Sequence, residues 1–98
     1  MPTFEVEERF RQAYQRLHVQ KKAAFLKARD DLVAWLVAKK KQPDLVPPAP
    51  LRLHFIESKD AWSITFGGDQ RALWRYGEEV LPGEVHIIWE RIDGHDIY

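Results

Sequence analysis

The sequence predicts an α+β fold in which a short N-terminal strand and a helical hairpin pack on a mostly antiparallel sheet of four to five strands. Three observations support this prediction. Apolar residues recur at helical spacing through residues 7–41, four prolines between residues 43 and 50 then stop the helix, and four strand-like runs follow. The length of 98 residues predicts a single domain covering 1–98.

The first elements are short. Residues 3–6 alternate between apolar and polar side chains, which predicts a strand. Glu7 and Glu8 then suit the first turn of a helix, because the helix dipole favours negative charge there. A helix over about 7–17 is predicted by apolar residues at spacings of three and four: Phe10, Ala13, Tyr14 and Leu17.

A second helix is predicted from about residue 20 to residue 41. A single helix over 7–41 would be about 52 Å long, whereas a compact domain of this size is about 33 Å across. We therefore expect a break near 18–20 and an antiparallel hairpin. The main apolar stripe is Phe25, Ala28, Leu32, Trp35 and Leu36, and it is widened by Leu26, Val33 and Val37.

The wide stripe allows two interpretations. Its flank at Leu26, Val33 and Val37 is either a groove for the amphipathic helix of a partner protein or a surface that packs on the first helix. The first interpretation predicts an exposed apolar patch around Val33 and Val37.

Strands are predicted at 51–57, 61–67, 71–76 and 85–92 after the Pro-rich loop. Alternation places one set of side chains against the helices and leaves Ser63 and Thr65 beside Arg71, Leu73 and Arg75 on the other face. Two apolar phases compete in the last strand, so a β-bulge is expected there. The set that faces the helices is Trp62, Ile64, Phe66, Ala72, Trp74 and Tyr76, and we expect these tryptophans in the core rather than stacked on bases.

Composition excludes several kinds of chemistry. There is no cysteine, so disulfides, thiolate zinc sites and cysteine nucleophiles are absent. The four histidines are scattered and show no metal-ligand spacing, so we expect neither a metal nor another cofactor. No apolar run approaches the roughly 18 residues of a membrane helix, and no signal segment is evident. We expect a soluble cytoplasmic protein.

The net charge of zero conceals an asymmetry between the two parts of the chain. Residues 1–41 carry ten Lys or Arg against five acids, and residues 42–98 carry five against ten. A basic helical half can attract a polyanion, or its lysines can simply be a solvated helix face. The acidic half opposes nucleic-acid binding at the predicted sheet.

The last third of the chain carries the residues best suited to chemistry. Arg71, Arg75 and Arg91 offer planar forks for phosphate oxygens. His95 can give and take protons near neutral pH, and Tyr98 follows it closely. This set fits phosphate binding and proton transfer. The alternative is an ordinary amphipathic sheet edge with a polar tail.

These elements and two local motifs resemble the RelE/ParE superfamily of type II toxins. The motifs are Gly-Asp-Gln-Arg-Ala-Leu-Trp-Arg at 68–75 and Arg-Ile-Asp-Gly-His-Asp-Ile-Tyr at 91–98. Arg91 precedes His95 by four residues, as in the RelE/YafQ-like branch of mRNA interferases. The resemblance implies a RelE/ParE-like fold and a ribosome-dependent mRNA endonuclease that acts without metal near the A site of the 30S subunit.

The resemblance also implies partners and residue roles. Arg71, His95 and Tyr98 correspond to catalytic positions: a phosphate-gripping arginine, a proton-transferring residue and a C-terminal aromatic that stacks or donates a proton. Arg75, Arg91 and His86 are expected to bind substrate, His86 on the condition that it lies on the same face of the sheet as the arginines. The family implies a cognate antitoxin, with operator DNA bound only through it, and no membrane.

The chain departs from the family pattern at Ser63 and Thr65, where the type member has lysines, and its sequence pI of about 6.9 is low for a toxin that docks on ribosomal RNA. Two alternatives therefore accompany the nuclease prediction. One is a ParE-like toxin that poisons DNA gyrase, and the other is a weakened member that acts mainly by binding its antitoxin. The His95 to Tyr98 tail favours the nuclease.

Overall fold

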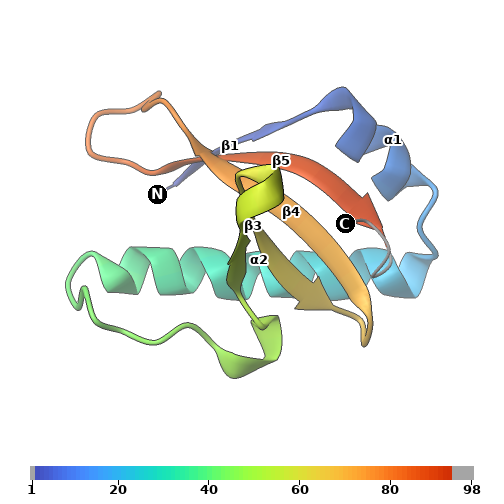
Figure 1. Ribbon diagram of the computed structural model, residues 1–98, viewed down its shortest axis with the longest axis horizontal. Coiled ribbons are helices and arrows are strands. Elements are labelled where there is room, and N and C mark those ends of the chain that lie inside the picture. The colour runs from blue at the N-terminus through green and yellow to red at the C-terminus, as the bar shows by residue number, and fades with distance from the viewer. Residues whose placement is uncertain (1, 94–98) are drawn as a thin grey trace.

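The computed structural model describes residues 2–93, and His95 and Tyr98 lie outside them. Two helices and a five-stranded, open, mixed sheet confirm the α+β class (Figure 1). Neither described helix is both long and apolar enough to cross a membrane. Two short 3-10 turns, η1 and η2, complete the elements: β1 Thr3–Val6, α1 Glu8–Gln15, α2 Val19–Lys39, η1 Ala49–Leu51, β2 His54–Ile56, η2 Glu57–Lys59, β3 Ala61–Phe66, β4 Gln70–Gly77 and β5 His86–Asp93.

The helix break is confirmed, although no glycine or proline marks it. His18 caps α2, because its side chain accepts a hydrogen bond from the Gln20 backbone N–H at 3.2 Å. Helix α1 has only eight residues and lies against β5. The ring centroids of Phe10 and Tyr14 lie 5.5 and 5.8 Å from that of Phe25. The two helices therefore touch near their junction and do not pair along their length as the predicted hairpin would.

The sheet has the order β1-β5-β4-β3-β2. The pairs β2–β3, β3–β4 and β4–β5 are antiparallel, which confirms the mostly antiparallel prediction, whereas β1 and β5 run parallel. The chain therefore places its last strand in the interior of the sheet, between β1 and β4.

The predicted strand over 51–57 is wrong in extent, because only His54–Ile56 pairs with β3. The turns η1 and η2 replace its two ends. Each turn is followed by a non-glycine residue in the left-handed region, Arg52 at φ 46° and Asp60 at φ 50°. A left-handed residue ends an extended run, so the strand cannot continue through either position.

The main stripe of α2 packs on one face of the sheet as predicted. Leu32, Ile64, Trp74 and Ile87 are fully buried there. The ring of Phe25 meets Trp89 at 5.1 Å and Phe66 at 5.4 Å. Large aromatic side chains bury more apolar surface than any others, and these rings join α1, α2, β3 and β5 into one core.

A β-bulge interrupts the pairing of β4 with β5, as the competing apolar phases predicted. Leu73 pairs with Arg91 and Trp74 pairs with Trp89, so Glu90 is the extra residue. The bulge shifts the alternation, and Trp89 and Ile92 consequently both face the helices. Glu90 and Arg91 remain together on the opposite side of the sheet.

We predict that the core stripe of α2 and the more exposed side of the helix at Leu26 differ sharply in their contribution to the free energy of unfolding. Leu32→Ala should lower the free energy of unfolding by about 2–5 kcal/mol, because it opens a cavity in the core. Leu26→Ala should cost less than about 1 kcal/mol, since Leu26 is 38% exposed. Urea unfolding measures both variants, and equal losses would contradict this packing.

Candidate functional site

The candidate site lies on the face of the sheet opposite α2, which we call the outer face. Cross-strand pairs place Ser63 beside Leu73 and Thr65 beside Arg71, as predicted. Ala61 and Leu73 are buried on this face and pack with Ile56 in a second, smaller apolar cluster. The charged residues of the site surround this cluster.

Arg71 and Arg91 come together at one end of the outer face. Arg91 pairs with Leu73, so it is the diagonal neighbour of Arg71, at about 7–8 Å on an antiparallel pair. Both side chains are half-buried. Arg71 donates a hydrogen bond to the Gln70 carbonyl at 3.2 Å, and its direct cross-strand partner is the exposed Asp93. Two guanidinium groups and one carboxylate therefore lie together at this end of the face.

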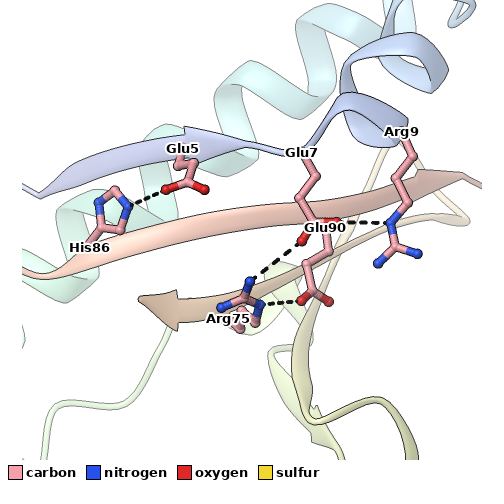
Figure 2. A network of polar contacts seen from close by, with 6 residues as sticks. All are labelled: Glu5, Glu7, Arg9, Arg75, His86 and Glu90. Carbon is pink, nitrogen blue, oxygen red and sulfur yellow. Dashed lines mark hydrogen bonds and ion pairs between the residues drawn. The ribbon is translucent and has the colours of Figure 1, made fainter. Parts of the chain in front are cut away.

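Arg75 is placed differently, in the middle of the outer face (Figure 2). Its Nε lies 2.6 Å from a carboxylate oxygen of Glu90, whose side chain is only 12% exposed. Its Nη2 lies 3.7 Å from a carboxylate oxygen of Glu7. Glu7 also binds Arg9 at 3.1 Å. Arg75 stands four residues from Arg71, about 13 Å along the strand. A phosphate approaching Arg75 would compete with two carboxylates that already neutralise it.

His86 lies at the far end of the outer face, on the first residue of β5 (Figure 2). Its Nδ1 is 2.7 Å from the Thr3 hydroxyl, and its Nε2 is 3.1 Å from the Glu5 carboxylate. A carboxylate only accepts hydrogen bonds, so Nε2 carries a hydrogen and donates it to Glu5, while Nδ1 shares a hydrogen bond with the Thr3 hydroxyl. Both ring nitrogens are thus used in joining β1 to β5.

The surroundings of His86 also favour a structural role. The side chain is 6% exposed, and a Cβ at its cross-strand partner Gly77 would lie 2.7 Å from the ring. Gly77 is six residues from Arg71, about 20 Å along β4. The structure therefore does not bring His86 to the arginine pair, although both lie on the outer face.

The two remaining described histidines bind the backbone close to their own positions. His18 caps α2, and His54 Nδ1 lies 2.9 Å from the Arg52 carbonyl. Residues 2–93 contain no group of three or more His, Asp or Glu side chains arranged to hold a metal ion.

A second candidate surface lies on the side of α2. We call it the α2 flank: an open groove of about 520 Å³ lined by Asp30, Val33, Ala34, Val37, Ala38 and Lys41. Val37 is 45% exposed. The groove lining contains no residue of α1. Leu26 instead lines another groove together with Tyr14 of α1. The interpretation that this side of α2 packs on the first helix therefore applies only near Leu26.

The carboxylates of the outer face were missed from the sequence. The pairing of β1 with β5 brings Glu5 and Glu7 near His86 and Arg75, across about 80 residues of chain, and the bulged pairing of β4 with β5 brings Glu90 to Arg75. Period-two alternation along 3–7 was the available signal, because it places Thr3, Glu5 and Glu7 on one side of the chain.

No protein-family model matches the chain, and no curated protein or solved structure matches it. The function proposed below therefore depends on the residues themselves and on their arrangement in residues 2–93.

We predict that Arg75 stabilises the fold whereas Arg91 does not. Arg75→Gln leaves Glu90 half-buried without its cation, and the free energy of unfolding should fall by about 1–2 kcal/mol. Arg91→Gln should change it by about 0.5 kcal/mol or less. Urea unfolding at neutral pH measures both.

The double variant Arg75→Gln with Glu90→Gln provides the control. Removing both charges should recover most of the loss, since no carboxylate is then left unpaired. Additive losses in the double variant would mean that the 2.6 Å contact contributes nothing to stability.

Proposed function

We propose that this protein is the toxin of a type II toxin–antitoxin system and that it cleaves mRNA on the ribosome without a metal ion. The observation that supports this most directly is the arginine pair. Arg71 and Arg91 are diagonal neighbours on β4 and β5, and Arg91 lies four residues before His95 in the sequence. The chemistry of these residue types suits a phosphodiester and a proton.

In the proposed reaction, the RNA 2′-hydroxyl loses its proton and attacks the adjacent phosphate, the P–O5′ bond breaks and the 5′-oxygen leaves with a proton, so that the products are a 2′,3′-cyclic phosphate and a 5′-hydroxyl. Arg71 and Arg91 stabilise the charge that develops on the non-bridging oxygens, which is the kind of contact that contributes most to such catalysis. His95 transfers a proton to or from the reacting oxygens. Tyr98 stacks on a base or donates a proton.

Arg75 and His86 are assigned substrate contacts away from the scissile phosphate. Each must first release its present partners. A phosphate that reaches Arg75 displaces Glu7 more readily than Glu90, because Glu7 lies at 3.7 Å and Glu90 at 2.6 Å. Phosphate binding at Arg75 therefore contributes less to the affinity for RNA than binding at Arg71 and Arg91.

A second candidate function is a member that has lost cleavage and acts by binding its antitoxin. The carboxylates of the outer face favour it, since Glu5, Glu7 and Glu90 oppose the attraction of a polyanion. Ser63 and Thr65 add no positive charge beside Arg71. The α2 flank does not depend on that face.

We further propose that the antitoxin binds the α2 flank with an amphipathic helix, and that operator DNA is reached only through the antitoxin. The groove offers Val33 and Val37 for apolar side chains at helical spacing, with Asp30 and Lys41 at its ends. A partner helix fits such a groove if it carries an apolar stripe, a basic residue that faces Asp30 and an acidic residue that faces Lys41.

We predict that Arg71→Ala and His95→Ala each abolish growth inhibition and mRNA cleavage. Loss of a general acid or base typically costs about 10²–10⁴ in rate, and loss of a charge contact in the transition state costs a similar factor. Residues that act as a unit do not add, so the double variant should be hardly worse than either single one. Induced expression with mapping of mRNA 5′ ends measures this.

Arg16→Ala is a matched control, since Arg16 is an exposed arginine at the end of α1 and should leave cleavage unchanged. Tyr98→Phe should be mild if the ring stacks and nearly as severe as His95→Ala if the hydroxyl carries a proton. Cleavage that survives intact in His95→Ala would reject the nuclease and leave the gyrase and binding-only alternatives.

A separate prediction concerns the antitoxin. Val37→Glu should weaken neutralisation, because a charge in the α2 flank opposes an apolar helix face. Val19→Glu is the control, since Val19 is 70% exposed on the same helix and lines neither groove. Co-expression with the proposed antitoxin, scored by growth, compares them. Equal neutralisation of both variants would place the antitoxin elsewhere.

A further inference from the structure

A third surface of α2 borders an open cleft of about 450 Å³, which shares no residue with the α2 flank and meets the outer face only at Thr65. The cleft lies between α2, η1 and the end of β3. It exists because β2 pairs with β3 only as far as Ser63, so the remainder of β3 has no strand on that side. Small-molecule sites in proteins have volumes of about 300–1,000 Å³.

The floor of this cleft is apolar. Helix α2 presents Ala24 and Ala28 to it, and Leu51 and Phe66 form the opposite wall. Leu51 is 2% exposed and Phe66 is 4% exposed. Because Ala24 and Ala28 carry only methyl groups, the space that larger side chains at these two positions would fill is left open.

Polar groups at the rim have unused bonding capacity. Arg52 is exposed, takes a left-handed conformation that residues other than glycine seldom adopt, and makes no ion pair within residues 2–93. Thr65 is 7% exposed, and its hydroxyl has no hydrogen-bond partner among the described residues. Both belong to the cleft lining.

The charge of the rim is positive. Lys27 is paired with Asp31 at 2.9 Å, and Lys21 covers the Gly67 carbonyl with a hydrogen bond of 2.6 Å. Arg52 adds a cation that has no counter-charge in the described chain. A charge-assisted hydrogen bond from a free guanidinium to a carboxylate is among the stronger polar contacts in proteins.

We propose that this cleft binds a small organic carboxylate with a compact apolar body. The carboxylate accepts hydrogen bonds from Arg52, and the apolar body lies over Ala24 and Ala28 against Phe66. The lining of this site includes neither Arg71 nor Arg91, so its occupation does not depend on the proposed nuclease function.

Benzoate and its neutral analogue benzamide form a matched pair of probes, because they share a ring and differ in charge. Backbone amide NMR spectra of the full chain should show saturable shifts at Ala24, Gly67 and Gly68 with benzoate. Benzamide should bind at least about tenfold more weakly. Benzoate without saturable shifts at these residues, or equal affinity for both probes, would overturn the proposal.

Two variants test the geometry. Arg52→Ala should weaken benzoate about tenfold to a hundredfold and leave benzamide unchanged, with Arg16→Ala as an exposed arginine control. Ala24→Leu should fill the floor and exclude both probes, and the same spectra report whether it folds. If Ala24→Leu does not fold, Arg52→Ala decides alone, since its side chain is exposed. Unchanged benzoate affinity in Arg52→Ala would refute the site.

Discussion

The pairing of β5 on both of its edges is the constraint on which the rest of this protein depends. β5 runs antiparallel to β4 and parallel to β1, so the last described strand joins the two ends of the chain. Its Ile87 and Trp89 are buried against the helices. A parallel partner requires a crossover connection, and the long path from β1 through α1, α2 and the other strands supplies it.

The position of β5 also divides the outer face into three regions of different charge. At the start of β5, His86 uses both ring nitrogens to bind β1. In the middle, Arg75 is neutralised by Glu90 and Glu7. At the end, Arg71 and Arg91 are diagonal neighbours, with Asp93 opposite Arg71. The three regions of the outer face therefore carry different combinations of charge.

Helix α2 has three surfaces with different roles. Its core stripe holds the sheet, and its α2 flank leaves Val37 exposed beside a groove. The third surface, at Ala24 and Ala28, borders the cleft next to Arg52. One wide apolar helix can thus hold the fold and still leave two hollows, because only the core stripe needs to be covered for stability.

The sequence by itself determined the fold class, the helix break, the bulge and the facing of Arg71 and Arg75. These follow from periodicity and from the length of chain that a compact domain can hold, which are local or global properties of the residues. The broken strand over 51–57 did not follow, because the left-handed conformation of Arg52 is uncommon for a residue other than glycine and the apolar pattern does not signal it.

Only the tertiary structure decided which charged residues have partners. Arg75 and Arg91 carry the same chemistry in the sequence, yet Arg75 meets two carboxylates and Arg91 lies diagonal to a second arginine. The difference arises from the parallel pairing of β1 with β5 and from one bulged residue, Glu90. An ion pair between distant segments depends on strand order and register, and no local pattern encodes either.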